Sequence, residues 1–130
     1  MARHLPIDPL ARQAVVAIGA GRVAIGIGAL FATRPALRAL GFGETDATGT
    51  ALAKVLGARD LTLGLVTLAA REDRGALRAA ALAAAALDAA DAVAFSYALA
   101  DPETRQAGLA GVATASAAAL AGAWAWRRLS

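Results

Sequence analysis

Five charged side chains lie deep inside apolar stretches of this sequence and are its best candidates for chemistry. Arg22, Arg59, Asp60, Asp88 and Asp91 each lie roughly two helical turns or more from the ends of their stretch. Charged groups in apolar surroundings are costly unless they are paired, and a carboxylate there can hold and exchange a proton. The sequence therefore predicts that these five residues form a binding site or a proton pathway.

The aspartates at positions 88 and 91 share one helical face because they are three residues apart. Two carboxylates this close resist double ionisation, so we expect one of them to keep a proton. We expect Asp91 to be the protonated one, because it has fewer evident partners than Asp88. Arg22 is expected to neutralise Asp60 or the Asp88 and Asp91 pair.

The signs of the buried charges allow a second, structural interpretation. With Lys54 included, the apolar stretches contain three positive and three negative side chains. Lys54 lies nearer the end of its stretch and is long enough to extend toward water. A compensated set of this kind also suits a network of ion pairs that only fixes the register of packed helices.

An enzymatic interpretation of Asp88-x-x-Asp91 is weaker. Membrane prenyltransferases and phosphatidyl-alcohol transferases use aspartate motifs to hold Mg²⁺ on a diphosphate. They need further aspartates, whereas Phe95 stands where one family has the next acid, and no second motif follows. Cysteine is absent and His4 is the single histidine, which excludes thiol chemistry and a multi-histidine metal site. The sequence favours a protein that is not an enzyme and has no cofactor or metal.

Four apolar runs must position the charged residues. A helix of about 20 residues crosses the hydrocarbon core of a bilayer, and each run has that length without an internal proline. We expect one all-α domain over residues 1–130, with four transmembrane helices in an antiparallel bundle. The predicted spans are 13–33, 47–70, 79–100 and 106–126.

The composition favours a membrane protein. The chain is 58% hydrophobic with a mean hydropathy of +0.56, and its charged fraction of 18% lies below the usual quarter. The last run is uncharged and ends in Trp124 and Trp126 followed by two arginines, as at a membrane interface. The alternative is a soluble bundle rich in alanine, but the first and last runs lack its polar face. Lipid is the expected partner, and nucleic acid is not, since basic residues do not cluster with aromatics.

Basic residues outside the runs predict the orientation. Seven arginines fall in the two tails and the second loop, at positions 3, 12, 71, 74, 78, 127 and 128. Three fall in the other loops, at positions 34, 38 and 105. The positive-inside rule then places both termini in the cytoplasm, with the chain in the cytoplasmic (inner) membrane. Arg22 interrupts the first run, so we expect the first helix to be retained rather than cleaved as a signal peptide.

Small residues in the runs predict close helix contacts. Residues 19–26 align with residues 57–64, with a glycine at each end of both segments and opposite charges, Arg22 and Asp60, at the equivalent position. Such a repeat would be inverted in a membrane, as in many transporters, although coincidence in a chain rich in Gly and Ala is the alternative. The predicted packing glycines are Gly19, Gly26, Gly57, Gly64, Gly111 and Gly122.

The last run offers a small-residue face for contact with a second copy of the chain. Its members are Gly111, Ala115, Ala118 and Gly122. Four spans are few for a transporter, so we expect a homo-oligomer or a place in a larger membrane complex.

The stretch Gly57-Ala58-Arg59-Asp60-Leu61-x-Leu63-Gly64 carries a resemblance. With Arg22 in a glycine-rich first span, Arg34-Pro35 after it and the paired aspartates in the third, the chain resembles uncharacterised small four-span membrane proteins of high-GC bacteria, a domain of unknown function. The resemblance covers residues from about 14 to 100 and implies an architecture but no activity. We expect a proton- or ion-coupled carrier of small solutes, and the alternative is a non-catalytic accessory or scaffold subunit.

Overall fold

Helices make up almost all of the chain. The computed structural model describes residues 7–130, and within that range it holds no strand. The α-helices are α1 (Pro9–Phe31), α2 (Thr33–Ala39), α3 (Ala47–Ala69), α4 (Arg74–Tyr97) and α5 (Arg105–Arg128), with short 3-10 helices η1 (Ala70–Glu72) and η2 (Ala98–Ala100). The predicted all-α class is confirmed, and each of the four predicted apolar runs overlaps one long helix.

Two helices begin earlier than predicted because aspartates cap them. The side chain of Asp8 accepts hydrogen bonds from the backbone N–H groups of Leu10 and Ala11, at 3.0 and 3.1 Å, and Pro9 occupies the first helical position. Helix α1 therefore begins four residues before the predicted start at 13. Asp73 caps α4 in the same way, so α4 begins five residues before 79. The charged segment predicted as a loop is thus nearly all helical.

A short helix, α2, occupies part of the loop expected between the first two predicted spans. Pro35 falls in the first turn of α2, where its missing N–H is not needed. The Thr33 hydroxyl donates to the carbonyl oxygen of Ala29 at 2.6 Å and so satisfies an acceptor near the end of α1. The expected loop is therefore partly helical, because Pro35 lies in the first turn of a new helix instead of ending all helical structure.

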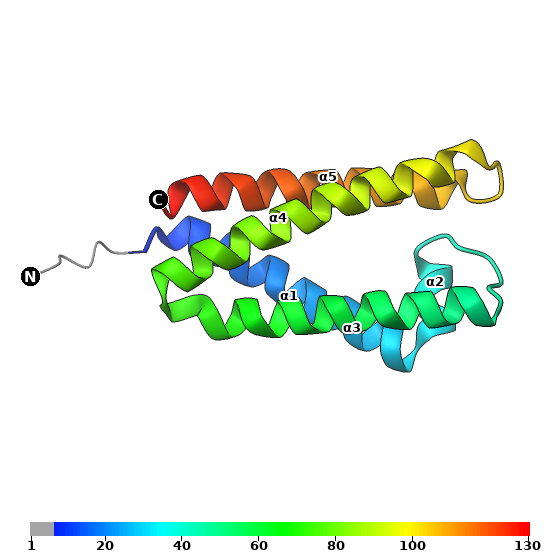
Figure 1. Cartoon of the computed structure of the whole chain (residues 1–130), viewed down its shortest axis with the longest axis horizontal. Helices are drawn as coiled ribbons and strands as arrows, with labels where there is room; N and C mark the ends of the chain where they lie inside the picture. The colour runs from blue at the N-terminus through cyan, green and yellow to red at the C-terminus, as the bar shows by residue number, and fades with distance from the viewer. Residues whose placement is uncertain (1–6) are drawn as a thin grey trace, which may run out of the picture.

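The long helices pack as two antiparallel pairs, α1 with α3 and α4 with α5 (Figure 1). Glycines bring α1 and α3 together. A Cβ atom added to Gly26 would lie 2.6 Å from the carbonyl oxygen of Gly57, and one added to Gly64 would lie 2.6 Å from that of Gly19. The four glycines are thus at two points of backbone-to-backbone contact, which no larger residue would permit.

The α1 and α3 contact matches the inverted repeat in the sequence. Moving 38 residues along the chain takes Gly19 to Gly57 and Gly26 to Gly64. When each glycine is exchanged for its equivalent in the other segment, the contact between Gly19 and Gly64 becomes the contact between Gly57 and Gly26. That contact is the second one found. The repeated segments are therefore related about a local two-fold axis between the helices, as an inverted repeat requires.

The small-residue face of α5 lies against α4 of the same chain. A side chain at Gly111 would collide with the Phe95 ring, and a Cβ at Gly122 would lie 3.0 Å from the Cβ of Ala85. Ala115, between these glycines, is buried. The expectation that this face contacts a second copy is therefore wrong for these three positions, because α4 already covers them.

The two helix pairs meet at both ends of the molecule. At one end α1, α4 and the end of α5 share an apolar cluster. Its members are Ala11, Val15, Leu77, Ala81, Ala125 and Leu129. At the other end the loop after α2 contacts α4, where the rings of Phe42 and Phe95 lie 6.4 Å apart. Between these apolar contacts lie the middles of the helices, which carry the buried charges.

Three helical segments are long and apolar enough to cross a membrane: α1, α4 with η2, and α5. Large apolar side chains on them face outward, with Phe31 83% and Leu120 72% exposed. Helix α3 is as long as α1 but contains three charged side chains and does not qualify by composition. The helices are compatible with a membrane protein.

Candidate functional site

Three helices bring the five predicted residues together. Arg22 comes from the middle of α1, Arg59 and Asp60 from α3, and Asp88 and Asp91 from α4. We call these five residues the charge network. They meet because the glycine contacts set Arg22 beside Asp60, while the three-residue spacing turns both α4 aspartates toward α3.

Arg22 connects α1 to both neighbouring helices. Its Nη1 donates to Asp60 Oδ1 at 2.7 Å, and its Nη2 donates to Asp88 Oδ1. The Arg22 side chain is only 7% exposed, so neither contact is screened by bulk water. The predicted pairing of Arg22 is confirmed, and it includes both partners rather than one of them.

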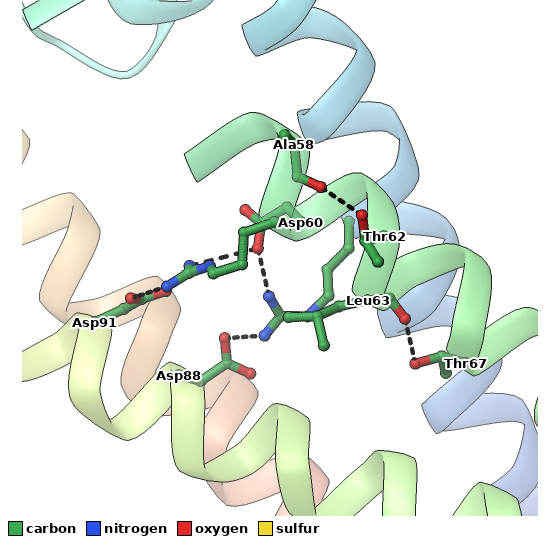
Figure 2. Close-up of polar contacts among 9 residues, drawn as sticks. Ala58, Asp60, Thr62, Leu63, Thr67, Asp88 and Asp91 are labelled. Atoms are coloured by element: carbon green, nitrogen blue, oxygen red, sulfur yellow. Dashed lines mark hydrogen bonds and ion pairs between the residues drawn. The ribbon is translucent and has the colours of Figure 1, made fainter. Parts of the chain in front are cut away.

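Arg59 connects α3 to α4 and shares Asp60 with Arg22. Its two terminal nitrogens donate to the two oxygens of Asp91, at 3.0 and 2.6 Å, in a bidentate pair. Its Nη2 also lies 3.4 Å from Asp60 Oδ1. Figure 2 shows the resulting chain of contacts, which runs from Asp88 through the two arginines and Asp60 to Asp91.

The partners of the two α4 aspartates are the reverse of the expectation. Asp91 was expected to have few partners, but both of its oxygens accept from Arg59. Asp88 accepts one contact at Oδ1, whereas its buried Oδ2 has no hydrogen-bond partner among residues 7–130. The reason for expecting the proton on Asp91 is therefore wrong.

Lys54 does not join the charge network. Its Nζ donates to the carbonyl oxygen of Leu30, close to the end of α1, and the side chain is exposed. A cation placed there satisfies an acceptor that the end of the helix leaves open. The network consequently contains two positive and three negative groups, not the balanced set that the sequence indicates.

Burial differs along the charge network, from an enclosed end to an end at the surface. Removing charges from water is expensive, and their mutual attraction offsets that expense only with good geometry and further hydrogen bonds. The side chains of Arg22 and Asp88 are 7% and 9% exposed, while those of Arg59 and Asp91 are 29% and 24% exposed. The pair at the outer end of the network therefore reaches the surface between α3 and α4.

No other chemistry stands out in the part of the chain that the structure describes. It holds no cluster of three or more His, Cys, Asp or Glu side chains that could bind a metal ion. Two surface hollows lie away from the network, one beside Arg38 and Glu44, the other beside Trp124 and Trp126. The charge network is the strongest candidate site.

Most of the chain matches one known protein family. Residues 19–127 match the family model described as Domain of unknown function (DUF4267). The chain belongs to DUF4267. The DUF4267 match extends through α5, beyond the region of about 14 to 100 that carries the resemblance in the sequence. No curated protein and no solved structure shows significant similarity to this chain.

All five network residues and all six packing glycines lie within the DUF4267 match. The sequence pattern does not indicate the contacts by which arginines join the helix ends of this chain. Arg12 Nε donates to the carbonyl oxygen of Arg71 at 2.9 Å, and Arg74 Nε donates to that of Leu129 at 3.0 Å. These residues entered the prediction only as orientation signals, and nothing in their spacing indicates the carbonyl partners.

Proposed function

We propose that this protein is a multi-pass membrane protein that acts as a non-catalytic accessory or scaffold subunit. One observation carries the proposal: the charge network joins the two helix pairs, because Arg22 and Arg59 each contact an aspartate of α4 as well as Asp60. Apolar contacts join the same pairs at both ends. Such an arrangement holds the helices in one register and suits a rigid surface for larger partners.

A membrane location is consistent with the exposed apolar side chains and with the paired charges of α3. Each unpaired charge near the bilayer centre costs about 2.5–3.5 kcal/mol, so α3 would insert poorly alone. Arg59 and Asp60 have partners on α1 and α4, and Lys54 reaches a carbonyl near the helix end. These contacts support our proposal of four spans in an antiparallel bundle. A soluble bundle would instead expose apolar side chains on every long helix to water.

We expect both ends of the chain to face the cytoplasm. Helix α1 begins and α5 ends at the same end of the bundle (Figure 1), and six of the nine loop and tail arginines among residues 7–130 lie at or beyond the helix ends on that side. Met1 itself lies outside the described residues. We expect activity from a reporter that works only in the cytoplasm when it is fused after Ser130. A reporter that must be exported to work should be inactive at the same position. The opposite pattern would contradict the orientation, and purification without detergent would contradict the membrane location.

A carrier of small solutes, coupled to a proton or an ion, is the second candidate. The two-fold relation between the repeats in α1 and α3 favours it, since carriers are often built from inverted repeats that meet near the membrane centre. A carrier would need the helix pairs to move relative to each other, whereas a scaffold keeps one arrangement.

Spin-label distances distinguish the two candidates. The chain has no cysteine, so Thr48→Cys in α3 and Gln106→Cys in α5 give one label on each helix pair. We expect one narrow distance distribution in lipid that is the same in mildly acidic and mildly alkaline buffer. Two populations whose ratio changes with pH would refute the scaffold and favour the carrier. Labels at Phe31 and Thr48, within one pair, are the matched control and should not change.

A further inference from the structure

The charge network holds one negative charge more than it can neutralise. It contains two arginines and three aspartates. Lys54, the third basic residue of the apolar runs, donates instead to the carbonyl oxygen of Leu30 near the end of α1. A net charge near the middle of a membrane is strongly unfavourable. The network therefore requires one further positive charge to be stable in that position.

Among residues 7–130, no side chain around Asp88 supplies that charge. Helix α1 presents Arg22, which already contacts Asp60 as well, and α3 presents Asp60 and Arg59. The neighbouring acid on α4, Asp91, is paired with Arg59, and α5 contributes no charged side chain along its middle. The part of the chain that the structure describes therefore leaves this charge to a bound cation.

The structure distinguishes the three carboxylates by their contacts. Both oxygens of Asp91 accept from Arg59, and Oδ1 of Asp60 accepts from both arginines. Asp88 is the most buried of the three, and its Oδ2 is enclosed without a hydrogen-bond donor among the described residues. An ionised oxygen in that position is costly, whereas a neutral carboxylic acid is far less so.

We propose that Asp88 binds one exchangeable proton at Oδ2, which makes the charge network electrically neutral. The proton comes from water: the Asp88 carboxylate and H⁺ combine to give the carboxylic acid, and the reverse step returns H⁺. Oδ1 still accepts from Arg22 after protonation, so uptake of the proton leaves the contact between α1 and α4 in place.

A proton fits this place better than a metal cation does. A metal ion such as Na⁺ or Mg²⁺ needs several oxygen ligands, and no group of three or more acidic or metal-binding side chains among residues 7–130 is arranged to supply them. Asp60 and Asp91 already accept hydrogen bonds from arginines, and these would have to break first. This proposal holds for a scaffold and for a carrier alike, because it concerns the charge state of the network and not movement.

Infrared spectroscopy of the full chain in lipid tests the proposal. At neutral pH the wild type should show a carboxylic-acid C=O band that shifts in D₂O and is lost in Asp88→Asn. Asp88→Glu should move the band to another frequency, whereas the matched variant Asp91→Glu should leave it where it is. The absence of an acid band in the wild type, or a band that moves in Asp91→Glu, would overturn the proposal.

A charge-balance experiment gives a second test that does not depend on altering Asp88. Asp91→Asn leaves two arginines and two aspartates in the network, so no further positive charge is needed. The acid band should then disappear in Asp91→Asn but persist in Asp91→Glu. If Asp91→Asn keeps the full band, neutrality of the network is not what holds the proton, and the proposal is wrong.

Discussion

Replacing Arg22 with methionine should lower the free energy of unfolding by about 3–5 kcal/mol. Methionine keeps the apolar stem but removes the guanidinium group that contacts both Asp60 and Asp88. Asp60 then keeps only its longer contact with Arg59, and Asp88 is left without any partner among the described residues. Reversible unfolding in mixed detergent micelles measures the change.

Double mutants separate the lost ion pairs from the lost packing. Adding Asp88→Asn to the Arg22 variant replaces the stranded acid with an amide, so the double mutant should recover part of the stability that the single mutant loses. Arg38, whose contact with Glu44 is exposed, is the matched control, and Arg38→Met should change stability by less than about 1 kcal/mol. Strict additivity of the Arg22 and Asp88 effects would show that the two side chains do not act as a pair.

Replacing Gly26 with alanine should separate α1 from α3 and cost about 1–3 kcal/mol of stability or more. The added Cβ would lie 2.6 Å from the Gly57 carbonyl oxygen and 2.6 Å from the Leu61 backbone nitrogen. Backbone atoms cannot move aside as a flexible side chain can, so the helices must part. That movement would also lengthen the contact between Arg22 and Asp60.

Gly21 is the matched control, since it lies in the same helix and a Cβ there would meet nothing within 4 Å. Gly21→Ala should leave stability unchanged or raise it by up to about 1 kcal/mol, because alanine favours the helix. Gly64→Ala, at the related contact with Gly19, should resemble Gly26→Ala. Equal effects of the Gly21 and Gly26 substitutions would contradict the close packing of α1 on α3.

Much of the fold could be predicted from the sequence because its causes are local. The length of an apolar run sets the length of a helix, and each of the four long helices falls on a predicted run. The errors at the helix starts are local too: Asp8 and Asp73 are recognisable capping residues, and Pro35 suits a first turn. The spacing of the glycines likewise identified the residues at which α1 and α3 approach.

The positions of the charged residues along the apolar runs were enough to predict that they meet, but the tertiary packing sets which of them are partners. It placed Lys54 outside the network, joined Asp91 to Arg59 and left one oxygen of Asp88 without a donor. It also turned the small-residue face of α5 onto α4. These outcomes depend on how each helix is rotated and crossed against its neighbours, because a rotation of part of a turn exchanges one partner for another. Helical periodicity specifies a face but not the direction in which that face points.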